Sequence, residues 1–264
     1  MTIAYALTNA RRPLISSQKP RIALRMDDVG ASSKYHEIYS KRWYGFGNIL
    51  FLKRMQRFKA WGPYNELTGL EWRSILFLLR KYNAKLTVAV TAAWVESDAS
   101  LVPYPQKWPE AFRELKLGVD EGLVSIASHG LTHCVLQDRA FLPNAFTSNR
   151  RAHREFWDWL PYETHRKHLI QSKDILENCF QCPINTLIPP GNVFSQSTID
   201  AAREVGFSFI NCATESRNVP GLRIIGNTNV AAFHDREVVL FGIQWFEKLL
   251  ASHVDNDTVF IHEL

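Results

Sequence analysis

The sequence is poor in cysteine and contains no long apolar run. It has four cysteines in 264 residues, too few and too scattered for the disulfide framework of a small secreted domain. Its clean apolar runs, such as residues 49–52 and 75–79, do not exceed five residues, whereas a membrane-spanning helix needs about 20 apolar residues. Near the N-terminus, Arg11 and Arg12 follow a mildly apolar start that lacks the long apolar core of a secretory signal. We therefore expect reduced thiols and a cytoplasmic protein.

Internal repeats, low-complexity tracts and linkers rich in Pro, Gly or Ser are also absent. The composition, 46% hydrophobic and 22% charged, is typical of a globular protein with a buried core. The length suits one large α/β domain, so we predict a single domain over residues 1–264. The net charge of +5 indicates an anionic partner, and charge alone does not choose among a membrane surface, an acidic glycan and nucleic acid. Nothing further favours nucleic acid, which we do not expect.

Short apolar or β-branched runs alternate with helical patterns along the chain. Strands are expected at 21–26, 85–91, 123–127, 184–188, 207–211, 229–233 and 258–261. Helices are expected at 69–82, 109–121, 164–180, 195–205 and 235–253. This alternation predicts an α/β fold, an irregular (β/α)7 barrel of mostly parallel strands.

Two insertions, at about 31–66 and 134–163, interrupt the alternation. Within the first, no acidic residue lies between Glu37 and Glu66, and Lys and Arg residues alternate with aromatic residues over 41–61. Such a stretch can contact a membrane surface, a lipid-linked sugar or an acidic glycan. A helix packed on the barrel with a solvated basic face explains the pattern equally well.

Two adjacent aspartates, Asp27 and Asp28, follow the first predicted strand. Successive residues of a strand point in opposite directions, so one carboxylate could bind a metal ion while the other acts as a base. The alternative is an ordinary pair of aspartates in a loop or at the start of a helix.

Two histidines, His129 and His133, follow the third predicted strand. In one helical turn this spacing directs both rings to one point, and two histidines with one carboxylate form a zinc-type shell that leaves a position open. The alternative is two unrelated loop histidines. His165 and His168 stand among charged residues of a predicted helix, where we expect a solvated face rather than a metal site.

Two further groups follow predicted strands: the turn Pro189, Pro190, Gly191 and Asn192, and His262 after the last strand. Parallel barrels place their active sites at the C-terminal ends of their strands. All four groups are therefore expected to meet at one end of the fold.

These motifs, in this order, resemble those of the polysaccharide deacetylase family, a NodB-homology, carbohydrate esterase family 4-like group. The resemblance runs from about Arg21 to the C-terminus. It implies an irregular barrel, a divalent ion, zinc most often and cobalt or iron alternatively, and metal ligands Asp28, His129 and His133. It also implies Asp27 as the general base and His262 as the general acid.

The chain departs from the family pattern in its third motif. An arginine that contacts the catalytic aspartate is replaced by Leu187, and Arg25 is the candidate substitute, with a surface or core-edge arginine as the alternative. The backbone oxyanion donor falls at Pro190, which has no N–H. Gly191 or Asn192 would then serve.

The combined expectation is a metal-dependent carbohydrate N-deacetylase that acts on an N-acetyl or N-acyl sugar, for which a lipid-linked or anionic sugar is a candidate. We expect it in surface-polysaccharide or lipid-linked glycan synthesis. One alternative is a binding protein that keeps the fold without turnover. Another is a deformylase-type hydrolase of a lipid-linked amino sugar, and a third is a non-haem iron oxygenase, whose centre also uses two histidines and a carboxylate.

Overall fold

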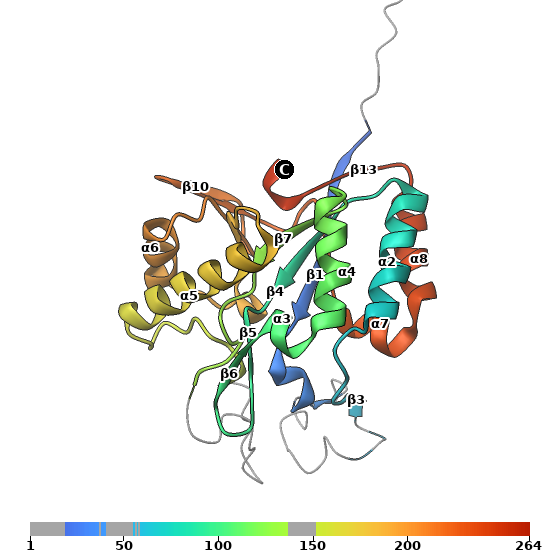
Figure 1. Cartoon of the computed structure of the whole chain (residues 1–264). Coiled ribbons are helices and arrows are strands. Elements are labelled where there is room, and N and C mark those ends of the chain that lie inside the picture. The colour runs from blue at the N-terminus through green and yellow to red at the C-terminus, as the bar shows by residue number, and fades with distance from the viewer. Residues whose placement is uncertain (1–18, 37, 41–54, 56, 58, 137–151) are drawn as a thin grey trace, which may run out of the picture.

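The computed structural model describes residues 19–36, 38–40, 55, 57, 59–136 and 152–264. A nine-stranded sheet forms its centre (Figure 1). The strands are β1 (Arg21–Val29), β4 (Leu86–Val90), β7 (Val124–Ser128), β8 (Thr186–Leu187), β9 (Phe209–Asn211), β10 (Arg217–Val219), β11 (Leu222–Ile225), β12 (Val230–His234) and β13 (Asp257–Val259). Their order is β10-β11-β9-β8-β7-β4-β1-β12, with β13 paired to β1, and only the β10–β11 pair is antiparallel.

The helices cover the outside of this sheet, and α2, α4 and α8 lie side by side (Figure 1). They are α2 (Gly69–Tyr82), α3 (Tyr104–Lys107), α4 (Pro109–Asp120), α5 (Tyr162–Phe180), α6 (Gln196–Glu204), α7 (Asp235–Phe241) and α8 (Ile243–Ser252). A capping box between Thr68 and Glu71 starts α2, which satisfies backbone N–H groups that have no partner within the helix. None of these helices is long and apolar enough to cross a membrane.

Alternation along β1 separates a core face from an inner face. Leu24 and Met26 belong to the main hydrophobic cluster, together with Trp72 of α2. Arg25 and Asp27 therefore point to the opposite, inner face of the sheet. Burial of the apolar face against the helices fixes the register of β1, because a one-residue slip would exchange the two faces.

The predicted fold class is confirmed as α/β with mostly parallel strands. The sheet is strongly curled: Arg25 on β1 bonds to Asn211 on β9 at 2.6 Å, although three strands separate β1 from β9 in the sheet order. Among the described residues the ladder has two ends, β10 and β12, with no backbone pairing between them. The barrel is therefore not closed by hydrogen bonds.

Short elements account for most differences from the predicted pattern. Four short strands were not predicted: β10, β11 and the hairpin of β5 (Ala93–Val95) and β6 (Leu101–Pro103). The helix expected at 235–253 is broken into α7 and α8 at Gly242, whose φ of 78° no helix contains. Most of the basic, aromatic stretch at 41–61 lies outside the described residues.

Candidate metal centre and active site

A β-bulge positions the two aspartates at the end of β1. The pairing of β1 with β4 shifts register between Met26 and Val29, and Asp28 has a φ of 69°. Bulges redirect side chains and are common beside active sites, and positive φ in a residue other than glycine is a strained conformation typical of such places. As a result Asp27 and Asp28 both line one cavity instead of pointing to opposite faces.

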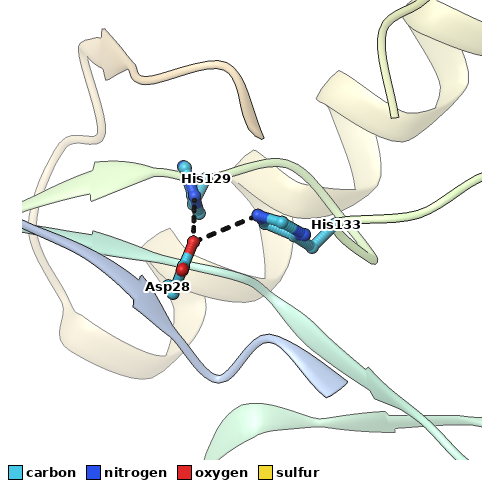
Figure 2. A group of neighbouring side chains, drawn as sticks. All are labelled: Asp28, His129 and His133. Atoms are coloured by element: carbon cyan, nitrogen blue, oxygen red, sulfur yellow. Dashed lines mark hydrogen bonds and ion pairs between the residues drawn. The ribbon is translucent and has the colours of Figure 1, made fainter. Parts of the chain in front are cut away.

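Asp28, His129 and His133 converge on one point (Figure 2). The Nε2 atoms of His129 and His133 lie 3.3 Å and 3.2 Å from the same oxygen of Asp28, Oδ1. The two rings are 4.9 Å apart between centroids. Burial alone would raise the pKa of Asp28, but the charge of His234 and the close contacts with His129 and His133 hold it well below its usual range.

The protonation of these rings fits a bound cation. His129 Nδ1 lies 2.6 Å from the Ile188 carbonyl, which can only accept, so Nδ1 carries the proton and Nε2 of the neutral ring has a lone pair. His133 Nδ1 contacts Ser33 at 3.1 Å, and its buried Nε2 has no hydrogen-bond partner among the described residues. Two ring nitrogens and a carboxylate oxygen that face one another form a donor set suited to a zinc-type ion.

The loop that carries the histidines is held by a buried carboxylate, not by the helical turn expected from their spacing. Glu155 accepts the backbone N–H groups of Leu131, Thr132 and His133 at 3.0, 3.1 and 2.9 Å. His168 contacts the same carboxylate at 2.6 Å. The loop approaches so closely that a Cβ on Gly130 would lie 2.1 Å from Glu155.

Substitution of Glu155 by Gln should lower the free energy of unfolding by about 3 kcal/mol, because buried N–H groups lose a charged acceptor. Thermal and urea unfolding of the metal-free protein measure this. Glu163→Gln, at an exposed position of α5, is the matched control and should change stability by less than about 0.5 kcal/mol. Equal stabilities for the two variants would contradict a clamping role for Glu155.

His165 and His168 are buried, contrary to the solvated face predicted for them. His165 faces α6, with its Nδ1 at 3.0 Å from Thr198. His168 faces Glu155, the carboxylate that holds the loop around His133. The charged neighbours in sequence lie on the other side of α5.

Arg25 reaches Asp27 directly. Its Nη2 donates to Asp27 Oδ2 at 2.7 Å, while Nη1 contacts Asn211 at 2.6 Å and Asn227 at 3.3 Å. Arg25 is 2% exposed, which rules out the surface alternative. The other carboxylate oxygen, Oδ1 of Asp27, is buried without a hydrogen-bond partner among the described residues. Leu187, at the position of the family's arginine, packs in the main hydrophobic core.

The turn at 190–192 contributes two of its three predicted residues to the cavity. Gly191 and Asn192 line it, whereas Pro190 is buried and does not. The Asn192 N–H bonds to the Pro189 carbonyl at 2.9 Å, and the Asn192 side chain accepts from Ala213. Because proline has no N–H, the Gly191 N–H is the remaining backbone donor of this turn.

His262 does not meet the other predicted residues, and its expected position was wrong. β13 pairs with residues 21–23 at the start of β1, so the chain after β13 lies at the end of the sheet opposite Asp27 and Asp28. His262 is exposed and stacks on Phe260 with ring centroids 5.6 Å apart.

A different histidine, His234, occupies the site. It is the last residue of β12 and pairs in register with Asp27. The cavity that it lines has a volume of about 70 Å³. Its lining consists of Asp27, Asp28, Trp61, His129, His133, Arg154, Gly191, Asn192, His234 and Arg236. His234 was not among the predicted site residues, although it too directly follows a predicted strand.

The electrostatic surroundings of His234 favour its protonated form. Burial lowers its pKa, but the charge of Asp28, a hydrogen bond to Glu237 and the charge of Asp27 together raise the pKa to about 9. Arg236 Nη2 also lies 3.3 Å from His234 Nδ1. Contact with Arg236 and Glu237 involves Nδ1, so Nε2 is the ring nitrogen available to a ligand in the cavity.

The raised pKa of His234 predicts how stability varies with pH in the metal-free protein. Since the folded value exceeds the unfolded value of about 6.5, protonated His234 stabilises the fold fully below that pH, and the contribution is lost as pH rises through about 9. Urea unfolding of wild type and His234→Gln should show a larger difference at acidic than at alkaline pH. The same comparison with His262→Gln is the control, and a pH-independent difference would refute the prediction.

Three buried charges fix the segments on both sides of this site. Lys34 pairs with Glu66 at 2.6 Å and with Asp235, the residue after His234. Glu66 also accepts the backbone N–H of Gly30 at 3.0 Å, and Tyr64 donates to Asp235 at 3.0 Å. Burial lowers the Lys34 pKa, but the two carboxylates raise it above its ordinary value. The cluster therefore connects the chain after Asp28 to the start of α7.

Several solved structures are similar to this fold. One is the 4-alpha-glucanotransferase of Thermococcus litoralis, with a TM-score of 0.56 and 9% identity over 93% of this chain and 40% of that one. A pseudoenzyme of the CE4 family from Bacillus anthracis has a TM-score of 0.48 and 14% identity over 94% and 66% of the two chains. The Xyl-CE4 domain of a xylanase from the hindgut metagenome of Trinervitermes trinervoides has a TM-score of 0.49 and 13% identity over 93% and 89%.

The chain thus spans less than two thirds of the length of the first two of these proteins. No curated protein matches it. The sequence model of the polysaccharide deacetylase family matches residues 66–210, more than half of the chain, and this span contains His129, His133 and the turn at 190–192. By this match, the chain belongs to the polysaccharide deacetylase family.

Proposed function

We propose that this protein is a metal-dependent hydrolase that removes an N-acyl group, most simply acetyl, from an amino sugar. The observation that carries the proposal is the convergence of Asp28, His129 and His133 beside a second carboxylate, Asp27, that is not part of the cluster. Two histidines and one carboxylate alone could hold a metal ion for hydrolysis or for oxygen activation. An adjacent base with an unpartnered buried oxygen favours hydrolysis over oxygen activation.

Each side chain has a separate role in the proposed reaction. A divalent ion held by Asp28, His129 and His133 would polarise the acyl carbonyl and lower the pKa of the attacking water. Asp27 takes a proton from that water as its oxygen bonds to the acyl carbon. The Gly191 N–H donates to the carbonyl oxygen as negative charge develops on it. His234 gives a proton to the sugar nitrogen as the C–N bond breaks, which releases an amine and a carboxylate.

Zinc is the proposed ion, with cobalt or iron as substitutes, because the ligands are two imidazoles and one carboxylate. The test is acetate release from N-acetyl amino sugars by protein reconstituted with each ion, with formate release measured in parallel on N-formyl analogues. Acetate release supports the deacetylase, and formate release alone indicates a deformylase. A protein that binds zinc and releases neither acid would be a binding protein with the deacetylase fold.

Loss of His234 should impair the reaction without removing the metal. In His234→Gln we expect kcat to fall by roughly 10²–10⁴-fold, the usual contribution of a general acid, with unchanged zinc content. His262→Gln, predicted as the acid from the sequence but exposed at the other end of the sheet, is the control and should retain activity. The reverse result would restore His262 to the mechanism.

The proposed cellular role is synthesis of a surface polysaccharide or a lipid-linked glycan in the cytoplasm. It is supported by the basic, aromatic composition of residues 41–61, which suits contact with anionic lipid headgroups. Sedimentation with vesicles, with and without anionic lipid, tests this contact.

A further inference from the structure

Two arginines stand beside the proposed metal ligands. Arg154 and Arg236 both line the cavity that contains Asp28, His129 and His133. Neither arginine belongs to the proposed catalytic residues, and neither lies in a motif that predicts a site residue. Their position requires an explanation, because arginine next to a cation site is electrostatically unfavourable unless a negative charge lies between them.

Arg154 reaches the cavity through space left by a glycine. A Cβ at Gly191 would lie 2.5 Å from Cζ and Nε of Arg154, so the guanidinium lies directly over this residue. Gly191 also has a φ of 60°, which side chains rarely adopt. Within the described ranges no carboxylate forms an ion pair with Arg154, so its guanidinium is not held in place by one.

Arg236 is held rigidly on the other side. Its guanidinium stacks 4.2 Å from the ring centroid of Trp61 and pairs with Glu237. The Arg236 side chain is only 14% exposed, so its orientation is fixed by neighbours before any ligand binds. A planar guanidinium fixed in this way is suited to bind carboxylate or phosphate.

The two aspartates that line the cavity pair with neither Arg154 nor Arg236. Asp27 is already paired with Arg25, and Asp28 belongs to the metal ligand set. The cavity, at about 70 Å³, is much smaller than the roughly 300–1,000 Å³ of a pocket that encloses a whole ligand. It accommodates the reacting group and one neighbouring substituent, with the rest of the substrate outside.

We propose that Arg154 and Arg236 bind an acidic group, a carboxylate or a phosphate, on the amino sugar whose N-acyl group faces the metal ligands. This inference rests on the proposed function for the identity of the sugar. Arg154 is the adjustable contact, because no ion pair holds it, and Arg236 with Trp61 forms the fixed wall.

The test compares matched probes by calorimetry on the zinc-loaded protein. N-acetylglucosamine 1-phosphate and an N-acetylhexosaminuronic acid represent the two acidic groups, and the methyl glycoside of N-acetylglucosamine is the neutral reference. At least one acidic probe should bind roughly tenfold to hundredfold more tightly than the reference, as expected for charge-assisted hydrogen bonds. Which acidic probe binds more tightly distinguishes phosphate from carboxylate.

Variants assign the preference to the cavity. Arg154→Gln should abolish the difference between acidic and neutral probes while zinc content and melting temperature stay the same, and Arg154→Lys should restore part of it. Arg113→Gln, on the exposed face of α4, removes the same charge elsewhere and should preserve the difference. Equal binding of all probes, absence of binding by both acidic probes, or an undiminished preference in Arg154→Gln would overturn the proposal.

Acetate release is measured on the same probes, so the two proposals can fail separately. Release without any preference for acidic sugars would leave the hydrolase and remove the acidic-group site. A preference that depends on Arg154 without release of acetate or formate would keep the site and remove the hydrolase.

Discussion

Asp28→Asn and His129→Ala proteins should each purify without the ion that the wild type retains, and should hydrolyse N-acetyl sugars more than roughly 100-fold more slowly. The effect should be at least this large, because loss of a residue that only hydrogen-bonds to a metal ligand already costs about 10–100-fold in metal affinity or activity. Elemental analysis of all three proteins gives the metal content, and acetate release gives the rate.

The geometry explains why single substitutions should suffice. Both histidine Nε2 atoms lie within 3.3 Å of the same carboxylate oxygen, so removal of any member leaves two donors where a zinc-type catalytic site needs three. Asp28→Asn is nearly isosteric, which separates loss of charge from loss of shape. Asp255→Asn, an exposed aspartate after α8, is the control for charge.

Chelation provides a second form of the same experiment. Wild-type protein treated with a chelator should lose activity and regain it with added zinc, whereas Asp28→Asn should not recover. A wild type that stays metal-free after incubation with zinc, cobalt and iron would contradict the metal centre and with it the hydrolase.

Strand-end motifs are the part of the site that a sequence pattern can bring together. Asp27 and Asp28 follow an apolar run in which alternate residues face the core, and His129 follows another, so parallel strands bring them to one edge. Arg25 and Asp27 are two residues apart and therefore share one face of the strand, which predicts that Arg25 can substitute for the family's arginine. The two side chains are paired at 2.7 Å.

The position of His262 could not be read from the sequence because a strand pattern does not give register. β13 has only three residues and pairs with the beginning of β1, which leaves His262 far from the end where the other strands finish. His234 was missed for a related reason. It falls at the junction between β12 and α7, where the helical pattern that begins at Asp235 gives no sign of a functional side chain in the residue before it.

Burial of Glu155 and His168 depends on long-range contacts that local patterns do not encode. Glu155 lies in an insertion without a predicted element, and its partners are backbone groups 22–24 residues earlier in the chain. Its role becomes recognisable only when the fold brings the carboxylate to the backbone N–H groups of residues 131–133.

Removal of the Asp27 carboxylate should separate catalysis from metal binding. In Asp27→Asn we expect kcat to fall by about 10²–10⁴-fold, the range for loss of a general base, with zinc content equal to that of the wild type. Asp27 Oδ1 is buried and has no hydrogen-bond partner among the described residues, so the amide is accommodated without displacement of a protein group. Loss of zinc together with activity would instead make Asp27 a ligand.

The partner of Asp27 should behave differently when it is removed. Arg25→Met leaves a buried carboxylate without its counter-ion, and removal of one member of a buried pair typically destabilises a protein by about 3–5 kcal/mol. In the double variant Arg25→Met/Asp27→Asn no uncompensated charge remains, so the loss of stability should be smaller than the sum of the single losses. Urea unfolding of the four proteins measures this coupling. Additive losses would mean that Arg25 acts through Asn211 and Asn227 rather than through Asp27.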